Sequence, residues 1–161
     1  MAVLKATAAL VLALAAVAGV LRLTSLWDRL LAPGELRKVD FANLELGPRP
    51  NQFLMCPPGL CRGATPHAES PVFARPAADL RRDLEAAALA TPGVEKVAEE
   101  GDTLYFVART PVMRWPDWIT LRVLDLGDGR STLAAYGRAV FGRRDFGANR
   151  ARIEGWLANL P

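Results

Sequence analysis

The sequence contains little of what an enzyme or a metal site needs. Among its 161 residues there are one histidine and two cysteines, and there is no nucleophile elbow, no H-E-x-x-H zinc motif and no phosphate-binding loop. The single histidine, His67, follows a proline and has no second histidine with which to share a metal, so we interpret it as a loop residue. From the sequence we expect no metal, no cofactor and no identifiable catalytic residue.

Lysine is also scarce, and the net charge is only +3. A protein that binds nucleic acid needs a broad basic surface, so we expect no nucleic-acid partner. The positive charge is unevenly distributed: residues 137–161 hold five arginines and two acidic residues, a balance of 5 − 2 = +3, which leaves 3 − 3 = 0 for residues 1–136. The charge excess of the chain therefore lies in its C-terminal segment.

The two cysteines, Cys56 and Cys61, enclose the tetrapeptide Pro-Pro-Gly-Leu. This spacing fits neither the redox C-x-x-C motif nor a zinc site. It permits a local disulfide if the domain lies in an oxidising compartment. The alternative is a pair of reduced thiols in a proline-rich turn.

The first 32 residues are predicted to form a membrane anchor. Residues 6–21 are almost wholly apolar and lie between Lys5 and Arg22. This run is slightly shorter than the roughly 17–25 residues that usually span a bilayer, but a helical pattern of leucines continues to Leu31. We predict a transmembrane or signal-anchor helix over residues 1–32, and a cleaved signal peptide is the alternative.

The rest of the chain is predicted to be one α+β domain. Residues 33–76 are rich in proline and have little periodicity, which indicates an extended segment that wraps the domain surface. In the core, residues 77–161, a helix is expected from Pro76 to about residue 90. Four strands are then expected, at residues 94–99, 103–110, 118–126 and 131–139.

Short turns separate these strands, so the sheet is expected to be an antiparallel meander. A final helix is predicted from about residue 146 to residue 159. Asp145 is its predicted N-cap, because a short carboxylate at that position accepts backbone N–H bonds. The predicted fold is thus a two-layer α+β domain in which two helices flank a four-stranded meander.

Three stretches of the sequence are similar to motifs of one known family. Residues 145–152 read D-F-G-A-N-R-A-R. Residues 109–117 contain R-T-P and R-W-P-D, and residues 51–54 read N-Q-F-L ahead of the cysteines. Together these motifs, over residues 45–160, resemble the domain of unknown function 1499 family.

The resemblance implies a single compact domain, which in bacteria often follows a membrane segment, and it implies no particular reaction. The chain departs from the family pattern at residues 136–140, which read Y-G-R-A-V where the family usually has serines and arginines. With the apolar run, the resemblance predicts a single-pass protein of the bacterial inner membrane. Positive charges after the run favour a cytoplasmic domain, whereas the possible disulfide and the signal-like N-terminus favour an extracytoplasmic one, which we predict.

The candidate site is a basic corner around the start of the final helix. Arginine side chains suit a phosphate or a carboxylate, and a helix N-terminus favours anions. The other interpretation is a structural latch in which Arg150 or Arg138 pairs with Asp145 or Asp117. The candidate residues are Arg138, Arg143, Arg144, Asp145, Asn149, Arg150 and Arg152, supported by Arg109, Arg114 and Asp117.

Two functions are compatible with this corner. The first is a non-enzymatic binding or scaffolding module, anchored in the membrane of the cell envelope, whose corner binds an anionic lipid or a small anionic ligand. The second is an enzyme of unrecognised type that acts on an arginine-bound anionic substrate through Asp117, Asp145 or Asn149. We expect the first, because no recognisable catalytic motif accompanies the arginines.

Overall fold

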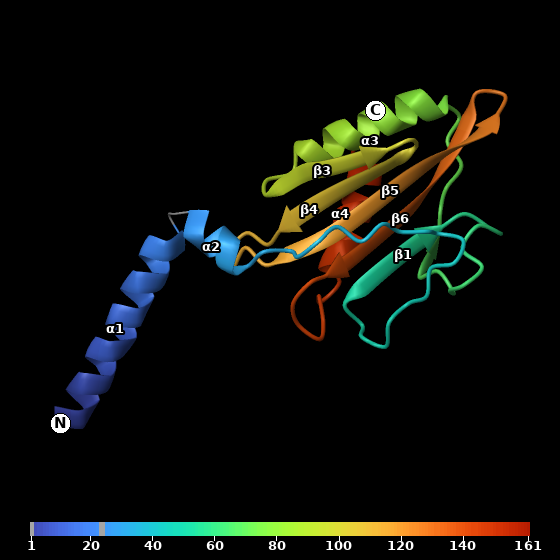
Figure 1. Ribbon diagram of the computed structural model, residues 1–161. Helices are drawn as coiled ribbons and strands as arrows, with labels where there is room; N and C mark the ends of the chain where they lie inside the picture. Colours follow the sequence, from blue (N-terminus) through green and yellow to red (C-terminus); the bar gives the residue numbers. More distant parts are fainter. Residues whose placement is uncertain (1, 23–24) are drawn as a thin grey trace. The chain divides into compact units, whose positions relative to one another are not determined.

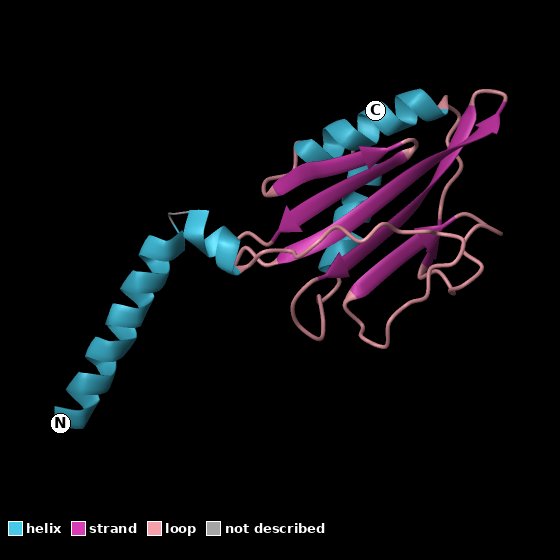
Figure 2. Cartoon of the chain, viewed as in Figure 1, coloured by secondary structure: helices cyan, strands magenta, loops and turns pink. Residues whose placement is uncertain are grey.

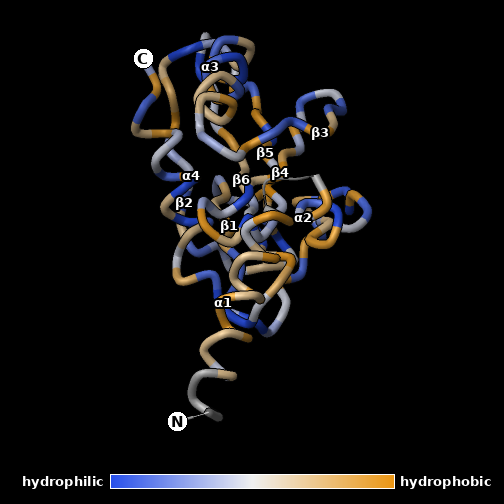
Figure 3. Tube along the Cα trace, turned by 90° about the vertical axis from the view of Figure 1, so that its left-hand side faces the viewer, coloured by the Kyte–Doolittle hydropathy of each residue, from blue (hydrophilic) through white to orange (hydrophobic). Residues whose placement is uncertain are grey.

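The computed structural model describes the backbone of residues 2–22 and 25–161 and the side chains of residues 6–21 and 26–161. The chain forms two compact units, Met1–Ala32 and Pro33–Pro161. The first unit contains helices α1 (Ala2–Arg22) and α2 (Ser25–Leu30) (Figure 1). Most of α1 is coloured as hydrophobic in Figure 3, because alanine, leucine and valine make up nearly all of its sequence.

The predicted transmembrane or signal-anchor helix over residues 1–32 is not supported. No helix in the part of the chain that the structure describes is both long enough and apolar enough to cross a bilayer. The described apolar side chains of α1 end at Leu21, and α2 is only six residues long and carries Asp28 and Arg29. The parts of the prediction that concern residues 1, 23 and 24 lie outside the described residues.

The second unit is built on a mixed six-stranded sheet with the strand order β2-β1-β6-β5-β4-β3 (Figures 1 and 2). Neighbouring strands are antiparallel except β1 and β2, which are parallel. The predicted antiparallel meander is present as the last four strands of the chain. The strands are β1 (Gln52–Cys56), β2 (Ala68–Glu69), β3 (Val94–Glu100), β4 (Thr103–Arg109), β5 (Pro116–Gly127) and β6 (Arg130–Ala139).

The two additional strands, β1 and β2, fall within the segment that was predicted to be extended without strands. Four of the five residues of β1 are buried, so β1 lacks the alternation of polar and apolar residues that marks a half-buried strand. β2 has only two residues and pairs with the end of β1. The sheet therefore has six strands where the sequence predicted four.

Helices α3 (Ala77–Leu89) and α4 (Ala148–Ala158) pack against one face of this sheet (Figure 2). Leu80 and Leu84 of α3 and Ile153 and Trp156 of α4 are all at most 3% exposed and belong to one core with the strands. This side of the sheet is the two-layer α+β arrangement that the sequence predicted.

The two stretches that flank β1, residues 33–51 and 57–66, supply side chains that pack on the opposite face of the sheet. Phe41 is wholly buried there and packs in one cluster with Leu54 of β1 and Tyr136 of β6. At the start of the first stretch, the indole Nε1 of Trp118 donates a hydrogen bond to the carbonyl oxygen of Pro33 at 3.0 Å. We call residues 33–51 and 57–66, which flank β1, the wrapping segment.

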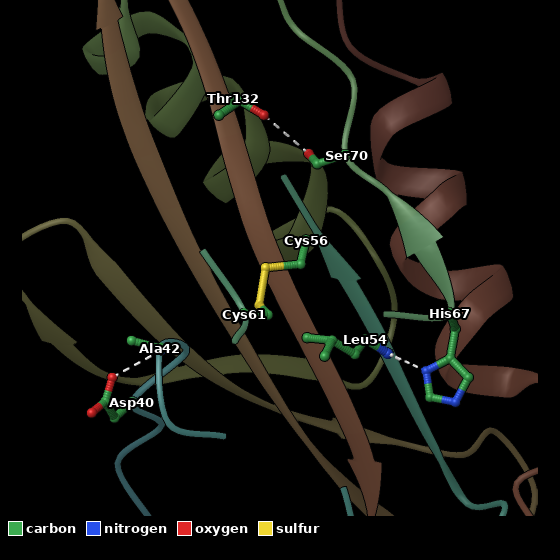
Figure 4. The surroundings of a disulfide bond; sticks show 8 residues. All are labelled: Asp40, Ala42, Leu54, Cys56, Cys61, His67, Ser70 and Thr132. Carbon is green, nitrogen blue, oxygen red and sulfur yellow. Dashed lines mark hydrogen bonds between the residues drawn. A yellow bond between two sulfur atoms is a disulfide. The ribbon is translucent and has the colours of Figure 1, made fainter. Parts of the chain in front are cut away.

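Two local links hold the wrapping segment to β1 (Figure 4). Cys56 and Cys61 form a disulfide, and both cysteines are buried. The backbone N–H of Leu54 donates to the Nδ1 atom of His67 at 3.0 Å, and the backbone N–H of His67 donates to the Leu54 carbonyl at 2.8 Å. His67 thus satisfies the backbone of β1 just before β2 begins, which is a structural role.

Candidate functional site

The residues of the predicted basic corner separate into three groups in the structure. One group bonds internally and joins β5 to α4. A second group lies exposed in the loop of residues 140–147, before α4. The two arginines of the third group take part in neither the network nor the loop. The three groups are Asp117, Asp145, Asn149 and Arg152; Arg143 and Arg144; and Arg138 and Arg150.

Asp145 occupies the N-terminal end of α4 with its own carboxylate. Its Oδ1 accepts the backbone N–H of Gly147 at 3.1 Å, and its Oδ2 accepts the backbone N–H of Asn149 at 3.2 Å. The residue at the N-cap position is Gly147, with φ 81°, and not Asp145 as predicted. Asp145 lies two residues before the N-cap, and its carboxylate accepts hydrogen bonds from the backbone N–H groups of Gly147 and Asn149. These two N–H groups are therefore not available to bind an anion.

Asn149 links Asp145 to the rest of the network and is wholly buried. Its Nδ2 donates to the Oδ2 of Asp145 at 2.9 Å, and its Oδ1 accepts from the Nη1 of Arg152 at 2.9 Å. β6 leaves room for this side chain at Gly137, where an added Cβ would lie 2.9 Å from the Cβ of Asn149. The amide therefore depends on a glycine in the neighbouring strand.

Arg152 joins α4 to β5 through Asp117. The Nη1 of Arg152 lies 3.2 Å from the Oδ2 of Asp117, and the two side chains are 12% and 5% exposed. Burial raises the pKa of Asp117, the charge of Arg152 opposes that increase, and the charge of Asp145 adds to it. A carboxylate this deeply buried needs its arginine, because an unpaired buried charge is strongly destabilising.

A latch of the predicted kind is therefore present, but its arginine is Arg152 and not Arg150 or Arg138. Arg150 pairs with Glu154 one turn along α4 at 2.9 Å, and its guanidinium carbon lies 5.5 Å from the ring centre of Phe53 in β1. Residues 150 and 152 are two positions apart, so they point to different sides of the helix. That spacing explains why only one of them reaches Asp117.

Arg138 lies on the other face of the sheet. Because side chains alternate along a strand and Gly137 faces Asn149 of α4, Arg138 faces the wrapping segment. It lines a cavity there with Trp118 and Tyr136. The sheet thus separates Arg138 from the other arginines of the predicted corner.

Arg143 and Arg144 are both exposed, and no hydrogen bond or ion pair joins either of them to another residue in the described part of the chain. Large apolar side chains lie in this loop and in the loop of residues 110–115, which precedes β5. The five apolar side chains, which we call the apolar rim, are between 39% and 92% exposed: Val112, Met113, Trp115, Phe141 and Phe146.

The two loops come together at the apolar rim. A cavity of about 330 Å³ lies between them and is lined by all five rim residues, by Arg144 and by Asp117. The backbone N–H of Thr110 donates to the Trp115 carbonyl at 3.0 Å, and the Nη1 of Arg109 donates to the Arg114 carbonyl at 3.2 Å. Arg109 and Arg114 thus help to shape one of the loops.

The described residues contain no group of three histidine, cysteine or acidic side chains that could hold a metal ion. Two acidic residues of the network lie near each other, but Asp145 is bound by α4 and Asp117 by Arg152. The hydrogen bonds and the ion pair of the network therefore act as a structural link between β5 and α4.

Sequence reasoning missed the apolar rim and the residues around Arg138. The rim is composed of single apolar residues in two loops that lie far apart in the sequence, so only the fold brings them together. A signal was nevertheless present, because V-M-R-W and F-G-R-R-D-F place exposed aromatic residues beside arginines in short loops. Loops tend to carry functional residues, and such loops therefore mark candidate contact surfaces.

The fold and these motifs define a class of protein: an α+β domain with a six-stranded sheet, two covering helices and a D-F-G-x-N-R-x-R sequence at the start of the last helix. The model of the family described as "Protein of unknown function (DUF1499)" matches residues 46–160. The chain belongs to this family, as its motifs indicated. A comparison with curated proteins finds none that matches.

Proposed function

We propose that the domain is a non-enzymatic binding module that contacts an anionic lipid surface through the apolar rim, with Arg143 and Arg144 beside it. One observation carries this proposal. Phe146 is 92% exposed although its backbone is left-handed, with φ 53°. Neither property benefits the isolated domain, so the residue calls for a partner.

The strain at Phe146 has an identifiable cause. A non-glycine residue with positive φ costs on the order of 1 kcal/mol, and glycine or asparagine would avoid most of that cost. Asp145 immediately before it and Gly147 immediately after it are tied together by a hydrogen bond of 3.1 Å. This tight turn holds the phenylalanine outside the fold, where its ring contacts solvent.

The other rim residues make the exposed ring part of a patch. Isolated apolar residues are common on protein surfaces, whereas a contiguous group of them marks an interaction site. All five rim residues line one cavity between two loops, and three of them are aromatic. Aromatic rings are well suited to the interface between lipid headgroups and acyl chains.

Arg143 and Arg144 determine the kind of surface that fits. Two exposed guanidinium groups without partners in the described chain stand beside the rim. Interfacial segments that bind anionic bilayers combine apolar side chains with arginine or lysine in this way. Each basic residue near such a surface contributes about 1 kcal/mol.

We favour this role over catalysis, since the oxygens of Asp145 and Asn149 are engaged within the network. We also propose that the domain lies outside the cytoplasm, at the bacterial inner membrane. The Cys56–Cys61 disulfide supports this location, because disulfides persist in oxidising compartments.

Vesicle binding tests the proposal. The core residues of the domain all lie in Pro33–Pro161, so a fragment of residues 33–161 avoids any binding through α1. We expect it to sediment with vesicles of phosphatidylcholine and phosphatidylglycerol and not with phosphatidylcholine alone. Arg143→Gln combined with Arg144→Gln should weaken this binding by about 2 kcal/mol, or roughly thirtyfold, and added salt should weaken it further.

Phe146→Asn tests the apolar part, because asparagine tolerates a left-handed backbone. We expect weaker vesicle binding with an unchanged or higher melting temperature. Two matched controls lie at the ends of β5 and β6, beside the turn that joins these strands. Arg130→Gln removes an exposed arginine, and Leu126→Asn removes a side chain that is 43% exposed. Equal binding by the wild type, Phe146→Asn and the double arginine variant would refute the proposal.

A further inference from the structure

We propose a second binding site, for a small organic oxyanion, in the groove between the wrapping segment and the sheet. The oxyanion is a carboxylate or a phosphate ester attached to a ring, and Arg138 is the residue that holds it. This site is distinct from the lipid contact, because no residue of the apolar rim lines the groove, and Arg138 does not line the cavity at the rim.

The groove has the size and position of a ligand site. A cavity of about 730 Å³ lies between residues 33–49 and strands β1, β5 and β6, and an adjacent cavity of about 300 Å³ shares Arg138, Trp118 and Tyr136 with it. Pockets for small molecules commonly have volumes of about 300–1,000 Å³. These three side chains belong to the lining of both cavities.

The strand register places Arg138 at the centre of a row across the sheet. Arg138 of β6 is paired with Gln52 of β1 on one side and with Trp118 of β5 on the other. Directly paired residues on neighbouring strands present their side chains on the same face. The guanidinium therefore stands between an amide and an indole on the floor of the groove.

The neighbours of Arg138 are all engaged with the protein. The hydroxyl of Tyr136 donates to the Oε1 of Gln52 at 2.7 Å. The Nε2 of Gln52 donates to the carbonyls of Gly47 at 2.6 Å and Arg49 at 3.1 Å. The indole of Trp118 donates to Pro33. These bonds fix both walls of the groove before any ligand binds.

Arg138 differs from these neighbours. Arg138 is half-buried, and no hydrogen bond or ion pair connects its guanidinium to any residue that the structure describes. A partly desolvated guanidinium without an acceptor is unfavourable, and its fork of N–H donors suits the two oxygens of a carboxylate or phosphate. An oxyanion ligand supplies the acceptor that the protein omits.

The other residues that line the groove indicate what kind of group carries the oxyanion. Trp118 and Tyr136 flank the arginine with aromatic surface, which suits a ring or another planar group. On the exposed edges lie Arg37 and Arg49, together with two acidic residues, Glu35 and Glu45. Three arginines and two glutamates leave a net charge of 3 − 2 = +1 in the larger cavity, which fits a ligand with a single anionic group.

The test uses the full chain, labelled with ¹⁵N, and three probes: phenyl phosphate, benzoate and inorganic phosphate. We expect phenyl phosphate or benzoate to shift the NMR signals of the Trp118 indole N–H and the Arg138 Nε–H saturably below about 10 mM. Inorganic phosphate should bind more weakly, because it has no ring to contact Trp118 and Tyr136.

Arg138→Gln should weaken binding by about tenfold or more, since it removes the charged fork. Arg122→Gln is the matched control: Arg122 is also a half-buried arginine of the sheet, in β5, and it lines neither cavity. Its affinity should equal that of the wild type. A thermal melt of each variant verifies that it is folded.

Three results would overturn the inference: no saturable shift of either signal with any probe, equal affinity in Arg138→Gln and the wild type, or saturable shifts confined to residues outside the groove. The last readout needs only the wild type, so it holds even if Arg138→Gln does not fold. Equal affinity for inorganic phosphate and phenyl phosphate would overturn the ring contact and assign the groove to free oxyanions.

Discussion

At the scale of single residues, Gly137 determines how closely α4 packs on β6. A Cβ added there would lie 2.9 Å from both the Cβ and the Oδ1 of Asn149. Asn149 has no space in which to move aside, because it is wholly buried and its amide is bonded to Asp145 and Arg152. The absence of a side chain at residue 137 is therefore a requirement of the network.

Gly137→Ala is expected to lower the free energy of unfolding by about 1–3 kcal/mol, which is the usual cost of an overpacked core. Urea denaturation measures this change. The control is Gly155→Ala in α4, where an added Cβ meets nothing within 4 Å, so it should be neutral or stabilising by up to about 1 kcal/mol. Wild-type stability in Gly137→Ala would mean that α4 adapts to the added methyl group without loss.

The ion pair of Asp117 shows how far residue types alone could predict the site. The sequence indicated that arginines and acidic residues gather near the start of α4, and the structure places a latch there. The partners were wrong, since Arg152 and not Arg150 or Arg138 binds Asp117. Which of two arginines reaches a strand depends on the rotation of α4 about its axis, and packing against the sheet decides that rotation.

At the scale of secondary structure elements, Asp117 and Arg152 couple β5 to α4 in a way that depends on pH. Burial raises the pKa of Asp117 in the folded domain, so the folded state holds this proton more tightly than the unfolded state does. The contribution of Asp117 to stability is therefore largest at low pH. It is lost as pH rises from the unfolded value of about 3.9 through the raised folded value.

Comparison with Asp117→Asn isolates this contribution. The unfolding free energy of the wild type minus that of Asp117→Asn should fall as pH rises through this window, because only the wild type ionises a buried carboxyl at residue 117. Denaturation at a series of pH values gives the difference. Asp128→Asn, in an exposed turn, corrects for the loss of one negative charge. A difference that grows with pH would mean that Arg152 outweighs burial.

The elements themselves were predictable where local signals agreed. Glycine-containing turns and short runs rich in β-branched or aromatic residues predicted the meander of β3 to β6, and Pro76 and the leucines of α3 predicted that helix. β1 was missed because it has only five residues and lies between Pro50 and Pro57 in a proline-rich segment. β2 was missed because its two residues carry no periodicity. Both strands depend on long-range pairing with β6 and with each other, which a local pattern does not record.

At the scale of the whole molecule, the wrapping segment extends the fold beyond the family match. The match begins at residue 46, yet Phe41 is wholly buried against the sheet and Pro33 accepts the hydrogen bond of Trp118. Residues 33–45 also form one wall of the groove around Arg138. The structural domain therefore begins at residue 33, where the second compact unit begins.

Two fragments distinguish this boundary from the family boundary. A fragment of residues 33–161 retains both clusters of core residues, whereas a fragment of residues 46–161 loses Phe41 and the Pro33 carbonyl. Removal of a buried phenylalanine side chain alone costs about 3–5 kcal/mol. We therefore expect the shorter fragment to be less stable to urea by more than about 3 kcal/mol. Phe41→Ala in the longer fragment should reproduce most of that loss, and equal stability of the two fragments would place the domain boundary at residue 46 instead.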